Sequence, residues 1–251
     1  MFERIKPVRI NEHIWLLNDK DESTGYLVMG KERALLIDTM NGYEDVNAVV
    51  RNLTELPFDV INTHGHPDHI YGNVYFDKVY MHPDDWEIAF GYLKNPEFKE
   101  AVRKRDLKFS GLLPVEEGDV FNLGGIKLEV YHIPGHTPGG ICLLDSEDRI
   151  LFTGDSIIEQ TWMQMEESLS LDVFYEALNK ITKIRDCFDY VLTGHTREKL
   201  EDASLCEVHR EAVHDIIEGK TANDVMYSWY GGIAKAHPYG KEPRRIVYKF
   251  T

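Results

Sequence analysis

The 251-residue sequence contains little cysteine and no long hydrophobic run. Its three cysteines, Cys142, Cys187 and Cys206, are widely spaced and form no CxxC pair, which excludes a disulfide framework and a thiolate zinc cluster. We expect all three to be buried as small hydrophobic side chains. No apolar run reaches the ~20 residues that a membrane span needs, and the first residues lack a signal-peptide pattern. These absences predict a cytoplasmic protein that does not bind a membrane.

Positive charge is also scarce. The chain has 28 Lys and Arg residues against 43 Asp and Glu residues, which gives a formal net charge of -15. Such a negative field repels polyanions, so we expect no nucleic-acid partner. The compact basic cluster of Arg103, Lys104 and Arg105 is interpreted as the solvated face of a helix.

The apolar pattern predicts a β-rich stretch followed by α/β alternation, twice along the chain. Period-two runs between turn-forming residues indicate strands, whereas residues 43–55 and 171–184 place apolar residues at helical spacing. Two such halves face to face give an α/β fold, a four-layer αββα sandwich with two central mixed β-sheets. The expected strands are 13–19, 24–30, 33–40, 58–64, 78–82, 119–123, 126–133, 140–145, 149–155 and 189–195.

No linker-like stretch divides the chain, so we expect a single domain over residues 1–251. A helical insertion at 84–113 is expected to form a lid, and residues 202–251 to add a C-terminal helix and a closing strand. The glycine-containing segment 222–240 is a second candidate lid. Several large apolar residues would line such lids, with core packing as the alternative: Trp86, Phe90, Tyr92, Phe98, Trp162, Met163 and Met165.

The densest cluster of metal-binding side chains is HGHPDH at residues 64–69, directly after an expected strand. It places three imidazoles, from His64, His66 and His69, and the carboxylate of Asp68 within six positions. These groups are ligands that zinc uses. The glycine and proline between them favour a tight, non-helical loop, in which neighbouring side chains diverge toward two adjacent ions. The motif therefore predicts a metal site.

Three further candidates each follow an apolar run: His136, Asp155 and His195. Each begins a loop where an expected strand ends. Such positions hold polar side chains at the rim of a sheet on a rigid support, where active sites are commonly built.

With these motifs the sequence resembles the metallo-β-lactamase superfamily over residues 20–200. The matching motifs, in order, are LLIDT with Asp38, HGHPDH, IPGHTPGG, FTGDS and LTGH. The resemblance implies that one metal is held by His64, His66 and His136 and a second by Asp68, His69 and His195, with Asp155 bridging both. It implies two zinc ions per chain, with iron or manganese as alternatives. It also implies that Asp38 supports the HGHPDH loop by hydrogen bonding.

The resemblance further implies a hydrolase in which a dizinc-bound hydroxide cleaves a small ester, thioester or lactone, with Asp68 orienting the hydroxide and handling its proton. The bridging aspartate is similar to that of glyoxalase II, acyl-homoserine lactonases and ribonuclease Z. The acidic charge disfavours the last of these. We expect a small-molecule substrate that the sequence does not identify, and the oligomeric state stays open, with a homodimer as one option.

Two alternatives remain at this point. The first is a mononuclear iron persulfide dioxygenase, which keeps the same motifs and fills one site. The second is a non-catalytic binding module on the same scaffold. Metal analysis separates the first from the dizinc hydrolase, and a substrate panel separates the second.

Overall fold

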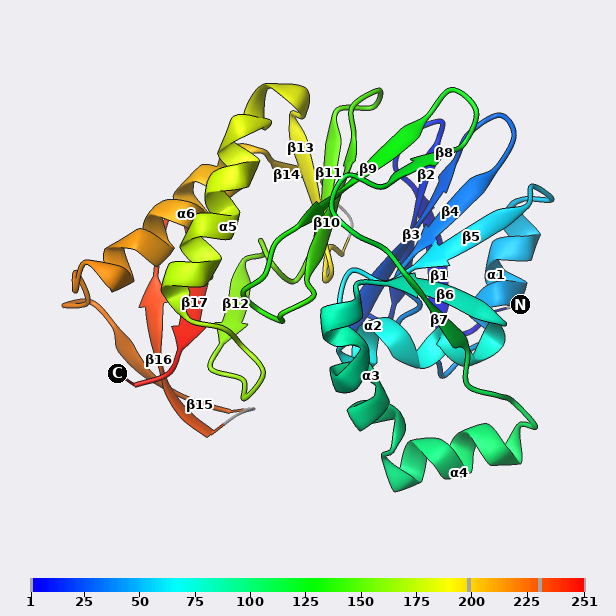
Figure 1. Cartoon of the computed structure of the whole chain (residues 1–251), viewed down its shortest axis with the longest axis horizontal. Helices are drawn as coiled ribbons and strands as arrows, with labels where there is room; N and C mark the ends of the chain where they lie inside the picture. The colour runs from blue at the N-terminus through cyan, green and yellow to red at the C-terminus, as the bar shows by residue number, and fades with distance from the viewer. Residues whose placement is uncertain (1, 198–199, 230–231, 251) are drawn as a thin grey trace.

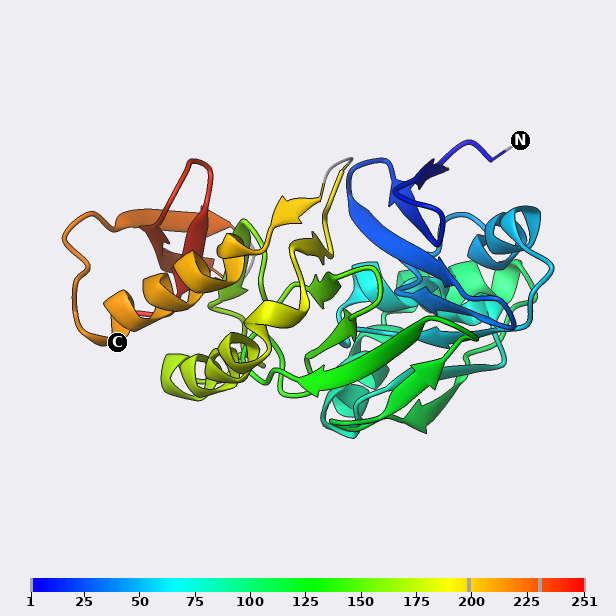
Figure 2. The same cartoon turned by 90° about the horizontal axis from the view of Figure 1, so that it is seen from above.

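The computed structural model of the chain describes residues 2–197, 200–229 and 232–250. Its strands form sheets of seven, six and four strands, with helices on the outside (Figures 1 and 2). None of the helices in these ranges is long and apolar enough to cross a membrane.

The seven-stranded sheet follows chain order. Its first four strands form an antiparallel meander, and from β4 to β7 the strands run parallel. The strands are β1 (Ile5–Arg9), β2 (Ile14–Asp19), β3 (Ser23–Met29), β4 (Ala34–Ile37), β5 (Phe58–Ile61), β6 (Lys78–Met81) and β7 (Gly111–Pro114). The helices between them are α1 (Val46–Leu53), α2 (Pro67–Ile70), η1 (Tyr71–Tyr75), η2 (Pro83–Asp85), α3 (Trp86–Leu93) and α4 (Pro96–Lys104).

The six-stranded sheet has the order β14-β13-β11-β10-β9-β8. β11 and β13 run parallel and are connected through helix α5, whereas their neighbours pair antiparallel. The strands are β8 (Val120–Asn122), β9 (Lys127–His132), β10 (Ile141–Asp145), β11 (Ile150–Gly154), β13 (Tyr190–Thr193) and β14 (Glu201–Asp202). The helices are α5 (Leu171–Lys183), η3 (Arg185–Cys187) and α6 (Ser204–Ile217).

Alternating side chains of each strand belong to different layers of the core. Leu16 of β2 packs with Phe152 of the second sheet, whereas the next residue, Leu17, packs on the side of Val50 in α1. On the far side of the second sheet, Leu151 packs against helices α5 and α6. Because successive strand residues point to opposite faces, both sheets are buried on both sides. The predicted four-layer αββα sandwich is confirmed.

The four-stranded sheet was not predicted. Its order is β12-β17-β16-β15, with bounds β12 (Gln160–Met163), β15 (Val225–Trp229), β16 (Gly232–Pro238) and β17 (Arg245–Tyr248). β17 lies in the segment where a closing strand was expected, and it pairs with β12 and β16. In the candidate lid 222–240, residues 225–229 and 232–238 form the β15–β16 hairpin, and residues 230 and 231 lie outside the described residues.

One smaller expectation needs correction. Cys142 and Cys206 are buried as expected, but Cys187 is exposed because it ends the short helix η3 at the surface. Arg103, Lys104 and Arg105 are exposed at the end of α4, in agreement with a solvated helix face. Arg103 and Lys104 lie next to Glu100, and the guanidinium of Arg105 donates to Gly42 O and to the hydroxyl of Tyr75.

Candidate metal centre

The structure brings all seven predicted ligands together at one edge of the two central sheets. His64 follows β5, His136 follows β9, Asp155 follows β11 and His195 follows β13. The carboxyl ends of neighbouring parallel strands meet at a common edge, so β11 and β13 hold Asp155 and His195 side by side.

The HGHPDH segment is only partly a loop. His64 to His66 are non-helical as predicted, but Pro67 begins the one-turn helix α2, which carries Asp68 and His69. The expectation of a wholly non-helical loop was therefore wrong. Proline is favoured at the first position of a helix because its fixed φ is preorganised and its missing N–H has no partner there. The bend at Pro67 separates the side chains of His64 and His66 from those of Asp68 and His69.

The first group of donors is formed by three buried histidines. His66 Nδ1 lies 3.1 Å from His64 Nε2 and 3.0 Å from His136 Nε2. Nitrogen atoms around one tetrahedral zinc lie roughly 3.4 Å apart, given Zn–N bonds of ~2.1 Å. The three nitrogens thus have spacings close to those of ligands on one ion.

Hydrogen bonds behind two of these rings fix which nitrogen is unprotonated. The hydroxyl of Thr63 donates to Asp38, so it accepts from His64 Nδ1 at 3.1 Å. His136 Nδ1 donates to Trp162 O at 2.7 Å. Each neutral imidazole then presents an Nε2 lone pair to the middle of the group. Converging lone pairs repel one another unless a cation lies between them.

The second group combines Asp68, His69 and His195. Asp68 Oδ2 lies 3.4 Å from Nε2 of each histidine. These distances exceed a good hydrogen bond and agree with the separation of two ligands on one ion.

Asp155 contacts both groups. Its Oδ2 lies 3.2 Å from His195 Nε2 and 4.0 Å from His136 Nε2, and its Oδ1 lies 3.6 Å from His69 Nε2. Asp155 Oδ1 and His69 Nε2 are both buried without a hydrogen-bond partner in the described part of the chain. Unpartnered buried polar atoms are costly, so two of them facing each other fit a bound cation.

The two groups differ in charge. Burial and the neighbouring imidazoles lower the pKa of His136 to about 4 and that of His64 well below its usual value. These rings are neutral, as ligands must be. In the second group burial opposes protonation of His69, but the carboxylates of Asp68 and Asp155 outweigh it and raise its pKa. The second group therefore carries a surplus of negative charge that a divalent cation would offset.

Asp38 supports the HGHPDH segment in the way the resemblance implied. Its carboxylate accepts from the backbone N–H of Thr63 at 2.7 Å, from the Thr63 hydroxyl at 2.8 Å and from His69 Nδ1 at 2.9 Å. The last bond occupies Nδ1, so Nε2 is the nitrogen of His69 that is directed at the second group and could bind a metal. Asp38 has a φ of +59°, a left-handed conformation that aspartate tolerates better than most residues.

Asp85 is a supporting residue that the sequence did not reveal. It is fully buried and accepts from Gly65 N at 2.7 Å, Thr137 Oγ1 at 2.7 Å and Gly139 N at 2.6 Å. It thus joins the HGHPDH segment to the loop of His136. It lies at the start of the segment interpreted as a lid, and its neighbours PDDW contain no pattern that distinguishes it from a surface aspartate.

Gly194 permits the close approach of the two groups. A Cβ atom at this position would lie 2.2 Å from Asp155 Oδ1 and 2.7 Å from His69 Cε1. Because Gly194 has no side chain, Asp155 and His69 can occupy the space beside its Cα.

The large apolar residues named as possible lid lining have different surroundings. Met163 and Met165 are buried, and Trp86 packs beside Met81 with its indole N–H on the Met81 carbonyl. The ring of Trp162, whose carbonyl holds His136, meets Trp229 of the β15–β16 hairpin edge to face at 5.3 Å. Two further members of the set remain near the surface: Phe90, and Phe98, which is stacked on Tyr71.

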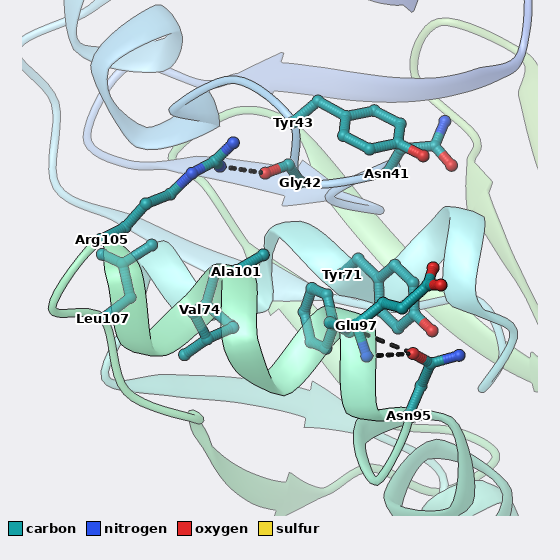
Figure 3. A pocket seen from close by; sticks show the side chains of 12 residues that line it. Asn41, Gly42, Tyr43, Tyr71, Val74, Asn95, Glu97, Ala101, Arg105 and Leu107 are labelled. Atoms are coloured by element: carbon teal, nitrogen blue, oxygen red, sulfur yellow. Dashed lines mark hydrogen bonds between the residues drawn. The ribbon is translucent and has the colours of Figure 1, made fainter.

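A separate pocket of about 200 Å³ lies between α4 and the loop at 41–43 (Figure 3). Tyr71 and Phe98, which stack on each other, are among the residues that line it. Arg105 reaches across to Gly42 O. None of the seven predicted ligands is among the residues that line it, so it flanks the insertion and is not the metal centre itself.

A further cluster, His82, Asp84 and His132, has its donor atoms close together. The two rings stack at 4.0 Å, His132 Nε2 donates to Pro138 O, and His82 Nδ1 accepts from Asp84 N. Two of the ring nitrogens are thus used within the protein, and we interpret the pair as a contact between the ends of β6 and β9.

Comparison with known proteins agrees with this arrangement. The family model described as the metallo-beta-lactamase superfamily matches residues 19–195. A hydroxyacylglutathione hydrolase of Francisella tularensis is 29% identical over 171 residues, covering 68% of this chain and 62% of that protein, less than two thirds of its length. An acyl-coenzyme A thioesterase of Bos taurus is 29% identical over 199 residues, covering 68% of this chain and 71% of that protein.

Solved structures share the fold at lower identity. A metallo-beta-lactamase from Pontibacter korlensis superposes with a TM-score of 0.64 at 18% identity, covering 84% of this chain and all of that one. A metallo-beta-lactamase family protein from Thermus thermophilus gives a TM-score of 0.58 at 19% identity, covering 87% and 79% of the two chains.

Proposed function

The chain belongs to the metallo-β-lactamase superfamily, and from this premise we propose that it is a two-metal hydrolase that cleaves a small acyl compound, an ester, thioester or lactone. The observation that carries the proposal is the pair of donor groups joined by Asp155, with its Oδ2 3.2 Å from His195 Nε2 and 4.0 Å from His136 Nε2.

Two divalent ions held there would activate water and polarise the carbonyl of the substrate, which is chemistry that needs no serine or cysteine nucleophile. The chain's own residues then have separate tasks. His64, His66 and His136 would hold one ion through imidazole nitrogens, and His69 and His195 with Asp68 would hold the other. Zinc fits this set of nitrogen and carboxylate donors.

Asp68 is the candidate catalytic residue. Its carboxylate is about one third exposed, whereas His69 beside it is fully buried. His195 is similarly exposed, and Asp68 differs from it in carrying a carboxylate that can accept a proton beside the other donors. We propose that it orients the attacking water and accepts its proton.

An acyl substrate is supported by the surroundings of His136. The backbone carbonyl of Trp162 contacts His136, and the partly buried Trp162 ring meets the exposed ring of Trp229 edge to face. Aromatic pairs of this kind bind apolar ligand groups. The relatives named above include a thioesterase and a glutathione thioester hydrolase, and thioesters are accordingly our preferred substrate class.

The second donor group also bears on the two alternatives. A mononuclear iron persulfide dioxygenase keeps the same motifs but fills one site, which would leave one of the two converging donor groups without a cation. A non-catalytic module gives no reason for buried unpartnered donor atoms at Asp155 and His69. We therefore favour the hydrolase over both.

The test is a substrate panel on the zinc-loaded protein. Aryl esters, short and long acyl thioesters, lactones and a phosphodiester are each assayed with the wild type and with Asp68→Asn, which keeps the side-chain shape. We expect hydrolysis of at least one acyl class and a 10²- to 10⁴-fold loss of kcat in the variant, the range of acid–base catalysis. A fully zinc-loaded protein that cleaves no acyl compound would refute the proposal.

A further inference from the structure

The two ring nitrogens of His66 have different surroundings. Nδ1 faces the Nε2 atoms of His64 and His136 at 3.1 and 3.0 Å. Nε2, on the opposite side of the ring, lies 2.8 Å from Glu167 Oε1. A carboxylate accepts hydrogen bonds and does not donate them when ionised, so Nε2 carries the proton and Nδ1 keeps its lone pair.

Glu167 is itself held in place. It lies in the segment after β12, where the hydroxyl of Tyr92 from α3 donates to the same Oε1 at 3.2 Å. The Tyr92 ring meets the His66 ring edge to face at 5.9 Å. Ser168, the next residue, donates to His136 O at 2.9 Å. One short segment thus contacts two of the three histidines of the first group.

The arrangement parallels that of the second group. There Asp38 accepts from the nitrogen of His69 that faces away from the other donors. Here Glu167 does the same for His66. Each group therefore has one histidine with a carboxylate behind it, and the two carboxylates come from opposite halves of the chain.

We propose that Glu167 is a positioning residue that fixes the ring and the tautomer of His66 for metal binding, and that Tyr92 fixes Glu167. The proposal rests on the two-metal function proposed above. It gives the helical insertion a role at the site, because Tyr92 connects α3 to the first donor group. Residues behind a ligating histidine typically change metal affinity by 10- to 100-fold.

The test measures zinc binding to the metal-free full chain by competition with a chromophoric chelator. We expect two ions in the wild type. In Glu167→Ala one ion should bind 10- to 100-fold more weakly while the other keeps its affinity. Glu167→Gln should lie between Glu167→Ala and the wild type, because an amide oxygen still accepts the proton of Nε2. Tyr92→Phe should weaken the same ion by less than 10-fold.

The matched control is Glu166→Ala, which removes an exposed carboxylate next to the proposed one. It should bind both ions as the wild type does. Substitution of Co²⁺ gives a readout besides affinity, since the visible spectrum of the first ion should change in Glu167→Ala and not in Glu166→Ala. Far-ultraviolet circular dichroism establishes that each variant is folded.

Two results would overturn the inference and leave the proposed function in place: wild-type affinities for both ions in folded Glu167→Ala and Glu167→Gln, or an equal loss of both ions. A wild-type chain that binds fewer than two ions would overturn the inference together with the proposed function.

Discussion

Asp85 joins two loops that approach each other from different halves of the chain. Its three acceptor contacts satisfy two buried backbone N–H groups, those of Gly65 and Gly139, and one hydroxyl. Burial raises the pKa of this carboxyl, and the three donors oppose that effect. A residue with no metal contact thus determines where the ligand loops lie.

We predict that Asp85→Asn lowers the free energy of unfolding by about 3 kcal/mol. The asparagine NH2 group cannot accept a hydrogen bond, so at least one of the three groups that donate to Asp85 would lose its acceptor. The measurement is urea unfolding of the zinc-loaded protein. Asp84→Asn is the control, since Asp84 is exposed, and should change the stability by no more than ~0.5 kcal/mol. Equal effects of the two substitutions would contradict the role given to Asp85.

Gly194→Ala tests the close approach beside Asp155. An added methyl group would lie 2.2 Å from Asp155 Oδ1, so either the strand end or the carboxylate must move. We expect the variant to fold and to lose at least one zinc ion, as measured by plasma mass spectrometry after gel filtration. Gly91→Ala, in α3, is the control because nothing lies within 4 Å of its added Cβ. A Gly194→Ala protein with the wild-type zinc content would show that the site tolerates this displacement.

His209 provides a pH prediction away from the metals. Burial, with a smaller effect of Arg244, lowers its pKa to about 3 in the folded chain, against ~6.5 in the unfolded chain. The unfolded state therefore binds the proton first. The contribution of His209 to the free energy of unfolding is fully present above pH ~6.5. It is lost as the pH falls from there toward 3, by up to about 1.4 kcal/mol per pH unit.

The check is the stability of the wild type and of His209→Gln between pH 7.5 and 5. The free energy of unfolding of the variant should depend less steeply on pH, by a slope that corresponds to at most one bound proton. Metal release at low pH affects both proteins, so the difference between the curves isolates His209. Parallel curves would contradict the assignment of its shift to burial.

At the scale of elements, the β15–β16 hairpin has one face whose side chains pack inward and an opposite face whose side chains point outward. Ala234, Ala236 and Val247 are buried beside Trp162 and Tyr227. In the ladder, Trp229 lies on the same face as Tyr227, and Met226 lies on the opposite face. Trp229 and Met226 are equally exposed, at 67% and 66%, which makes them a matched pair.

We predict that Trp229→Ala raises KM for a long-chain acyl thioester at least 5-fold and leaves KM for an acetyl thioester within 2-fold. Met226→Ala should change neither. Steady-state kinetics on the two substrates gives the answer. An equal effect on both substrates would show that Trp229 supports the fold and does not bind the acyl group.

The strands also show which parts of the fold and of the candidate site could be predicted from the sequence. The candidate ligands could be singled out because HGHPDH is dense in metal-binding side chains and because His136, Asp155 and His195 each follow an apolar run. A strand end fixes a side chain at the rim of a sheet whatever the partner strands are, and the division of the candidates between two ions came from the family resemblance. The third sheet was missed because its strands come from separate parts of the chain and form one sheet through long-range pairing, such as Trp162 with Val247. Asp85 and Glu167 were missed for the same reason, since each acts on a residue far away in sequence.

At the scale of the whole molecule, each donor group contains side chains from both halves of the sandwich. His64 and His66 come from the first half and His136 from the second, and Asp68 and His69 likewise face His195. A metal bound to either group therefore links the two sheets, and ligand binding to the native state alone stabilises it by mass action.

We predict that removing the metals with a chelator lowers the free energy of unfolding, by about 2.7 kcal/mol for each ion whose free concentration was 100 times its dissociation constant. Chemical unfolding with and without zinc measures the difference. An unchanged stability in a protein shown to have lost its metal would mean that the halves are held by the core alone.

The central claim is that Asp155 joins two metal sites in one catalytic centre. The most direct measurement is the metal content of the wild type and of Asp155→Ala by plasma mass spectrometry, with hydrolysis of an acyl thioester assayed on the same samples. The proposed mechanism predicts two zinc ions per wild-type chain, and loss of both metal and turnover in the variant. One iron per chain with oxygen uptake on a persulfide, or full activity of Asp155→Ala, would contradict it.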